Sequence, residues 1–238
     1  MNDSTREAAL NALLEALLAT PLNQETSLDE LASRCEGFTR DDMGEYWMAG
    51  AEGSDDEVPV DDLGYELDDL ADQKGLYLER LYDDRFIPRR MVQDRTIDIS
   101  QVVGVRLSRR AYGPIESCRQ FTYANGRIDV GQGVYYEEPL ASATANDDAD
   151  FTIKRSLECN QVGSWKRWYW SMVDDAGSWE LVLTMRDGSV FVSQGNGEWP
   201  EGFWGLWQSM VLATFDATIL DGDFRRDKDL MIDLSIRD

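Results

Sequence analysis

Residues 179–192, WELVLTMRDGSVFV, contain two short runs in which large apolar residues alternate with other residues, one on each side of Asp187-Gly188. Alternation with a period of two is typical of a β-strand that buries one face, and an Asp-Gly pair favours a tight turn. These residues therefore predict an antiparallel hairpin that turns at Asp187-Gly188. Pro200 follows and fits the first turn of a helix. We expect that helix to pack through an apolar face made of Phe203, Trp207, Met210 and Val211.

Seven of the eight tryptophans lie between Trp165 and Trp207. A tryptophan can bury about 150–250 Å², so tryptophans at a contact between a hairpin and a helix are expected to be core residues. We predict that Trp165, Trp179 and Trp207 are buried. Tryptophan is also enriched at binding hot spots and can hold a sugar or a cationic ligand, which leaves open an aromatic patch. That patch would comprise Trp168, Trp170, Trp199 and Trp204, and we expect at least one of the last three to be exposed.

Further strands are expected before the tryptophan-rich block. Residues 97–107 alternate between apolar and polar side chains, as strands do. Asn125-Gly126 separates two strand-like runs and predicts a two-residue hairpin turn, because both residue types tolerate positive φ. Residues 142–150 are predicted to form an exposed loop, and residues 163–173 fit either a strand or a helix.

The N-terminal part is expected to be helical. Residues 4–18 and 27–35 each begin with a capping-box pattern and continue with apolar residues at helical spacing. Further helices are predicted over residues 40–49 and, starting at Asp61 or Asp62, up to Gln73. Residues 76–82 fit either a helix or a strand.

Together these patterns predict an α+β protein with three parts. Residues 1–87 form an acidic helical domain, residues 88–95 a charged linker, and residues 96–238 an α+β domain. The last domain is expected to contain an antiparallel sheet with at least one packed C-terminal helix.

The chain carries a formal net charge of −23, and the acidic residues are unevenly distributed. Residues 25–72 contain 17 acids against Arg34 and Arg40. An anionic surface repels phosphates and anionic lipids, so direct nucleic-acid binding and membrane association are not expected. The segment is either a solvated surface or a face that meets a basic partner. The candidate partner-binding residues are Asp41, Asp42, Glu45, Asp55, Asp56, Glu57, Asp61 and Asp62, together with Trp170, Trp199 and Trp204.

The residues that usually carry chemistry are sparse. The chain has no histidine, which excludes Ser-His-Asp and Cys-His hydrolases and histidine-ligated metals. Cys35, Cys118 and Cys159 are odd in number and widely spaced, which indicates reduced thiols rather than disulfides or a zinc site. Adjacent aspartates such as Asp174-Asp175 are typical of turns. We therefore predict no catalytic residue, no structural metal and no cofactor.

A set of short motifs runs through the tryptophan-rich block: Ser164-Trp165, Tyr169, Asp175 to Gly177, Trp179-Glu180-Leu181, Asp187-Gly188, Gly195-Asn196, and Trp199-Pro200 with Phe203. With these motifs, residues 157–215 resemble the C-terminal part of a group of largely uncharacterised bacterial α+β proteins. The resemblance implies a hairpin packed on helices and brings no activity with it. In this chain Gly195 and Asn196 are adjacent, where the group has them spaced.

The sequence favours a non-catalytic interaction protein of bacterial, phage or mobile-element origin that binds a basic protein through its acidic N-terminal part. Acids near the N-terminus and the absence of a long apolar run indicate a cytoplasmic protein. Two alternatives remain open: a DNA mimic that inhibits a nucleic-acid-binding protein, and a hydrolase that depends on carboxylates.

Overall fold

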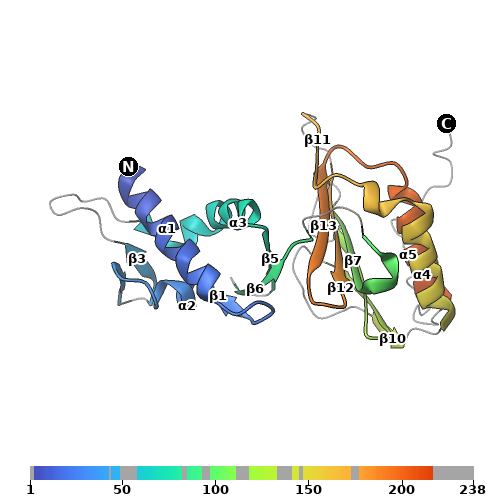
Figure 1. Cartoon of the computed structure of the whole chain (residues 1–238), viewed down its shortest axis with the longest axis horizontal. Coiled ribbons are helices and arrows are strands. Elements are labelled where there is room, and N and C mark those ends of the chain that lie inside the picture. Colours follow the sequence, from blue (N-terminus) through green and yellow to red (C-terminus); the bar gives the residue numbers. More distant parts are fainter. Residues whose placement is uncertain are drawn as a thin grey trace. The chain divides into compact units, whose positions relative to one another are not determined.

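The computed structural model describes residues 3–42, 44–48, 58–81, 85–92, 97–110, 118–132, 141–144, 147–172 and 177–216. The chain divides into two compact units, Met1–Met91 and Val92–Asp238, which are described separately below (Figure 1). Both units combine helices with β-sheets, so the chain is an α+β protein.

In its described residues, the first unit contains three α-helices and two small sheets. The helices are α1 (Asp3–Ala19), α2 (Leu28–Ala32) and α3 (Gly64–Gln73), with a 3-10 turn, η1 (Val60–Leu63), before α3. One sheet has the order β1-β6-β5 (Thr26–Ser27, Arg85–Arg90, Leu76–Arg80), and the other has the order β2-β3-β4 (Phe38–Arg40, Tyr46–Met48, Val58–Pro59). The prediction of a helical N-terminal part is therefore incomplete, because this unit also contains strands between its helices.

The N-cap half of the capping box predicted at Ser27 is confirmed. The Ser27 hydroxyl accepts a hydrogen bond from the backbone N–H of Glu30 at 3.2 Å, which caps α2. The Glu30 carboxylate in turn accepts a hydrogen bond from Thr26 Oγ1 at 3.1 Å. The core of this unit lies between the helices and the strands and includes Leu13, Leu31, Leu63, Leu67 and Phe86.

The helix predicted over residues 40–49 is wrong, because this segment forms the β2–β3 hairpin. The backbone N–H of Asp41 donates to Glu45 O, and the Asp41 carboxylate accepts a hydrogen bond from the Glu45 N–H, both at 2.9 Å. Gly44 has a φ of +94°, which glycine adopts without strain. The Asp41 side chain and Gly44 together favour a turn over a helix.

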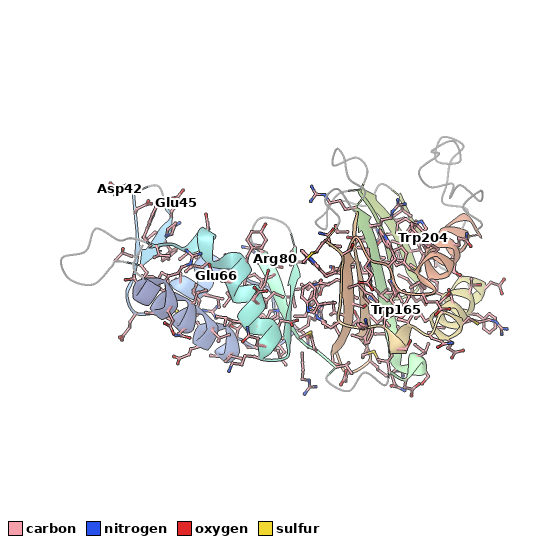
Figure 2. All side chains as sticks on the ribbon, turned by 90° about the horizontal axis from the view of Figure 1, so that it is seen from above. Asp42, Glu45, Glu66, Arg80, Trp165 and Trp204 are labelled. Atoms are coloured by element: carbon pink, nitrogen blue, oxygen red, sulfur yellow. The ribbon has the colours of Figure 1, made fainter. Side chains whose placement is uncertain are left out.

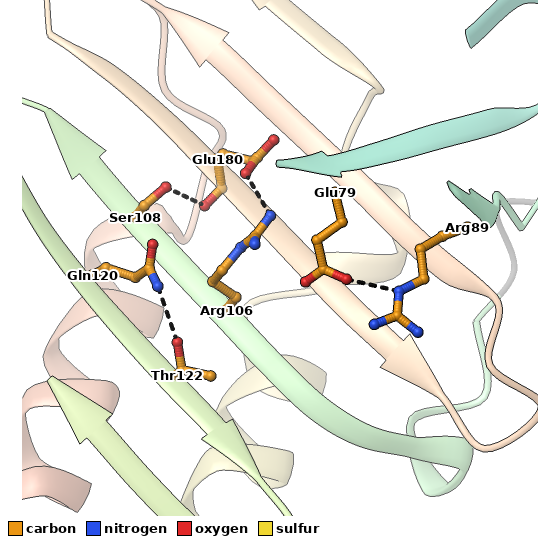
Figure 3. Close-up of polar contacts among 7 residues, drawn as sticks. All are labelled: Glu79, Arg89, Arg106, Ser108, Gln120, Thr122 and Glu180. Carbon is orange, nitrogen blue, oxygen red and sulfur yellow. Dashed lines mark hydrogen bonds and ion pairs between the residues drawn. The ribbon is translucent and has the colours of Figure 1, made fainter. Parts of the chain in front are cut away.

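Residues Pro88 to Arg90, which were predicted to begin a linker, belong to β6. The physical reason is that their charges are satisfied within the sheet: Arg89 Nε lies 2.7 Å from a carboxylate oxygen of Glu79 on β5 (Figure 3). Phe86 and Pro88 are buried, and they alternate with more exposed neighbours as a strand requires.

The second unit, in the residues that the structure describes, has a seven-stranded sheet with two long helices on one face (Figure 1). The strand order is β10-β9-β8-β7-β12-β13-β11, and every pair is antiparallel except β11 with β13. The strands are β7 (Val102–Arg110), β8 (Cys118–Ala124), β9 (Arg127–Gln132), β10 (Ala141–Thr144), β11 (Trp168–Trp170), β12 (Ser178–Met185) and β13 (Val190–Asn196). The helices are α4 (Asp147–Cys159) and α5 (Phe203–Asp216), with 3-10 turns η2 (Ile99–Gln101) and η4 (Val162–Ser164).

Both predicted hairpin turns are confirmed. Asn125 and Gly126, with φ of 52° and 71°, form the two-residue turn between β8 and β9. Asp187 and Gly188 lie in the turn between β12 and β13, where Met185 N–H donates to Ser189 O at 2.8 Å. Three residues, 186–188, lie between the hydrogen-bonded residues Met185 and Ser189, one more than in a two-residue turn.

The exposed loop predicted for residues 142–150 is wrong. Ala141–Thr144 pair with β9, and α4 begins at Asp147. Ala149, Ile153 and Leu157 are spaced by four residues and are buried on one face of α4. Acids at the start of a helix interact favourably with its dipole, so this acidic run begins a helix.

Candidate functional site

The turn between β2 and β3 carries three of the predicted acidic residues. Asp42 and Glu45 are exposed there (Figure 2). Asp41 is partly buried, and its second carboxylate oxygen accepts a hydrogen bond from Trp47 Nε1 at 3.0 Å. Asp41 therefore holds the turn in shape, whereas Asp42 and Glu45 present their charge to solvent.

The remaining acidic candidates are only partly described. Asp61 lies in η1 and is exposed. The side chain of Asp62 and all of Asp55, Asp56 and Glu57 lie outside the described residues.

Several arginines of the first unit form ion pairs with carboxylates of the same unit. Four ion pairs join Arg6 to Glu66, Arg80 to Asp68, Arg85 to Glu25, and Arg89 to Glu79. The hydrogen bond from Arg6 is the main cause that lowers the pKa of Glu66, so this carboxylate stays ionised. Residues 1–91 nevertheless contain 23 acids and 8 bases, a net charge of −15. The exposed acids in the described part of this unit, defined here as the acidic surface, are Glu7, Glu15, Glu25, Asp29, Glu30, Glu36, Asp42, Glu45, Asp61 and Asp69.

The predicted buried tryptophans are confirmed. Trp165 and Trp179 are each 3% exposed and Trp207 is fully buried. The Trp165 and Trp179 rings meet edge to face with centroids 5.8 Å apart. Trp179 Nε1 donates to Glu198 O at 2.8 Å, and Trp165 Nε1 donates to Asn160 O at 3.2 Å, so both indole N–H groups are satisfied despite burial.

The other four tryptophans of the block, Trp168, Trp170, Trp199 and Trp204, do not form the single patch that the sequence predicted. On β11, Tyr169 packs against Trp179 on the helix-covered face, with centroids 5.6 Å apart. Because side chains alternate along a strand, Trp168 and Trp170 point to the opposite face. They are 50% and 68% exposed, so the expectation that at least one outward tryptophan is exposed is confirmed.

Trp199 and Trp204 belong instead to the helix-covered side. Trp199 stacks on Trp179 and lies 5.3 Å from Trp204, measured between ring centroids. Trp204, at the start of α5, is 41% exposed and has the Arg109 guanidinium 5.1 Å from its ring centroid (Figure 2). Strand alternation at β11 is the signal that separates these two groups, and residues 163–173 did not reveal it because they fit two periodicities.

The sheet face on which Trp168 and Trp170 lie carries polar side chains on β7, β8 and β12 (Figure 3). Arg106 on β7 pairs with Glu180 on β12 at 3.1 Å, and Gln120 donates to Thr122 Oγ1 at 3.3 Å. These residues alternate along their strands with core residues, which places them on the face opposite α4 and α5.

A polar contact that the sequence did not predict joins β8 to α4. The Tyr123 hydroxyl donates a hydrogen bond to Asp150, whose other carboxylate oxygen lies 3.1 Å from Lys154 Nζ. Burial raises the pKa of Tyr123 above its ordinary value, and the hydrogen bond and charge of Asp150 raise it further. A phenol held in its neutral form acts as a hydrogen-bond donor here and not as a base.

This contact predicts that the second unit loses stability at high pH. An unfolded chain ionises Tyr123 near its ordinary pKa of 10, whereas the folded chain keeps it neutral. The stability contributed by this difference is therefore complete below pH 10 and is lost as the pH rises through the raised folded pKa. Urea denaturation, followed by tryptophan fluorescence from about pH 8 to about pH 11, should show a steeper loss for the wild type than for Tyr123→Phe. Equal losses in the two proteins would contradict the assignment.

Cys35 and Cys159, the cysteines whose side chains are described, are both free thiols. Cys35 Sγ donates to Leu31 O at 3.2 Å and to Ala12 O at 3.4 Å, and burial raises the pKa of this thiol. Cys159 is exposed and, like Cys35, forms no disulfide within the described residues, whereas the side chain of Cys118 lies outside them.

Among the described residues, no group of three or more Cys, Asp or Glu side chains is placed to hold a metal ion. In the same part of the chain, no helix combines the length and the apolarity that crossing a bilayer requires. No protein-family model matches the sequence, and a comparison with the curated proteins gives no match. The resemblance of residues 157–215 to the bacterial α+β group therefore stays a prediction.

Proposed function

We propose that this chain is a non-catalytic cytoplasmic protein, of bacterial, phage or mobile-element origin, that binds a basic protein through the acidic surface of its first unit. The observation that carries the proposal is the surplus of exposed carboxylates in that unit. Its arginines Arg6, Arg80, Arg85 and Arg89 are already held against carboxylates. Exposed acids outside these ion pairs, such as Asp42 and Glu45, present their charge to an external cation.

The acids of the β2–β3 turn are the best anchor for such a partner. Asp42 and Glu45 project from a turn whose shape is fixed by the Asp41 carboxylate and by Trp47. Glu36, which precedes β2, is exposed as well. A turn that is already held by hydrogen bonds loses less conformational entropy when a partner binds, and its charge attracts a basic surface before contact.

We expect binding to weaken as salt is added. The Debye length falls from about 10 Å at 0.1 M salt to about 3 Å at 1 M, so steering between exposed charges is lost. Electrostatic steering changes association rates by about 10- to 1,000-fold. Capture of basic proteins by the immobilised full chain, from a nuclease-treated bacterial lysate, should therefore be strong at low salt and weak at high salt.

A charge-matched pair of variants tests which acids are responsible. The triple variant Glu36→Gln, Asp42→Asn, Glu45→Gln should lose capture. The control variant Glu158→Gln, Glu198→Gln, Glu201→Gln removes the same charge from exposed positions of the second unit and should retain capture. Equal behaviour of the two variants would show that only the net charge matters and would refute the proposed site.

The identity of the captured protein separates this proposal from DNA mimicry. A partner that binds nucleic acid and is displaced from the chain by duplex DNA would indicate that the acidic surface imitates phosphates. A basic partner that duplex DNA does not displace would support the proposal as stated.

A further inference from the structure

The described part of the seven-stranded sheet ends in two edges of different character. At one edge, β10 exposes the small polar side chains of Ser142 and Thr144. At the other edge, Trp168 and Trp170 of β11 are 50% and 68% exposed, and Met172 just beyond it is 96% exposed. An exposed apolar edge strand is a ready template for another strand. The β11 edge therefore has the properties of an interaction surface.

In the part of the chain that the structure describes, β11 has β13 on one side and no strand on the other, which is called its open edge here. Arg167 O accepts a hydrogen bond from Gln194 N–H, and Ser171 N–H donates to Asn196 O, both at 3.0 Å. The backbone groups of these two residues thus face β13. Along a strand, alternate residues direct their N–H and C=O groups to opposite sides, so Trp168 and Trp170 direct theirs to the open edge.

We propose that β11 pairs antiparallel with β11 of a second copy of this chain, about a twofold axis at Tyr169. In this register Trp168 lies opposite the partner's Trp170, and Trp170 lies opposite the partner's Trp168. Each of these two pairs exchanges both of its backbone hydrogen bonds, because both residues direct their N–H and C=O groups outward. The two sheets then form one continuous sheet through an isologous contact.

The side chains of β11 and of the residues next to it are compatible with this register. Opposite residues of antiparallel strands place their side chains on the same face, so Trp168 stacks beside the partner's Trp170. Lys166 faces the partner's Met172, and Arg167 faces the partner's Ser171, so no two cations are directly opposed. The Arg167 guanidinium already lies 4.7 Å from the Trp168 ring centroid. The sequence around Tyr169 is therefore complementary to itself.

Salt distinguishes this contact from the binding of a basic partner. Each copy carries a net charge of −23, so two copies repel each other at low salt. Screening of that repulsion should strengthen the self-association, whereas it weakens binding of a basic protein to the acidic surface. Failure of one proposal therefore leaves the other intact.

The first test is the oligomeric state of the full chain. Sedimentation velocity across a range of protein concentrations should show a monomer–dimer equilibrium that shifts toward the dimer as salt is added. Trp170→Lys places a charge on the open edge and should raise the dimer dissociation constant at least about tenfold. Phe151→Lys also replaces an exposed aromatic residue with lysine, but on α4, and should leave the dimer dissociation constant unchanged. A chain that stays monomeric, or a dimer that both variants weaken equally, would overturn the proposal.

The second test fixes the register. Variants Trp168→Cys and Trp170→Cys are prepared in a Cys159→Ser background, and the parent background serves as the control for other thiols. Hydrogen-bonded antiparallel pairs have Cα atoms about 5.5 Å apart, a separation that a disulfide spans. Under mild oxidation, a mixture of the two variants should form a heterodisulfide dimer that neither variant forms alone. Equal crosslinking in the mixture and in the single variants would refute this register.

Discussion

Replacing Trp207 with alanine should lower the free energy of unfolding of the second unit by about 3–5 kcal/mol. Trp207 is fully buried, with its ring edge-on to Phe121 at 5.0 Å and stacked near Phe203 at 6.2 Å between centroids. Alanine removes the contacts of the indole and leaves a cavity in the layer between the sheet and α5. Because a domain is stable by only about 5–15 kcal/mol, the variant should melt early and accumulate poorly. Urea denaturation followed by tryptophan fluorescence measures the loss.

Trp170→Ala is the matched control for this substitution. Trp170 is 68% exposed, and an exposed substitution usually changes stability by no more than about 0.5 kcal/mol. At a protein concentration where the chain is monomeric, the control should unfold like the wild type. A Trp207→Ala loss no larger than that of Trp170→Ala would contradict the core role assigned to Trp207.

Local signals in the sequence predicted the elements that form through local contacts. Asn125-Gly126 and Asp187-Gly188 turn hairpins because of the conformations that their own backbones prefer. Ser27 caps α2 through a hydrogen bond to a residue three positions away. The apolar face of α5 follows directly from the spacing of Phe203 and Trp207.

The failures arise where a distant or unrecognised contact prevails over local periodicity. Residues 40–49 have apolar residues at helical spacing, but Asp41 binds Glu45 and Trp47 and closes a hairpin instead. From the sequence alone, Arg89 is predicted to belong to a charged linker. Its ion pair with Glu79 on the neighbouring strand is a contact that the sequence does not reveal. Residues 142–150 were predicted to form a loop because adjacent aspartates are typical of turns. The helical spacing of Ala149 and the later buried residues of α4 was therefore not recognised.

The sequence predicts which residue types make up the candidate surfaces, but it does not predict where the structure places them. The acidic excess of the N-terminal part is visible in the sequence, but which of Asp41, Asp42 and Glu45 is exposed depends on the turn that they form. Likewise, the tryptophan-rich block predicts a core with some exposed rings. Only the pairing of β11 with β13 determines that Trp168 and Trp170 share a face that Trp204 does not.

Replacing Gly195 with alanine should destabilise the second unit by about 1–3 kcal/mol, the usual cost of overpacking a core. A Cβ atom at this position in β13 would lie 2.5 Å from Trp179 Nε1 and 2.8 Å from Glu198 O. Those two atoms form the 2.8 Å hydrogen bond that satisfies the buried indole. The methyl group can be accommodated only if that bond lengthens or the Trp179 ring shifts within its stack against Trp199.

Gly131→Ala in β9 of the same sheet is the control for this last substitution. The nearest atom to a Cβ there is Gln120 Cβ at 3.9 Å, an ordinary contact, and neither glycine requires a positive φ. Because alanine restricts the unfolded chain, Gly131→Ala should be neutral or stabilising by up to about 1 kcal/mol. A double variant that adds Trp179→Leu to Gly195→Ala should lose less stability than the two single variants together, since leucine lacks the atoms with which the methyl group collides. Full additivity would show that the collision with Trp179 is not the cause of the loss.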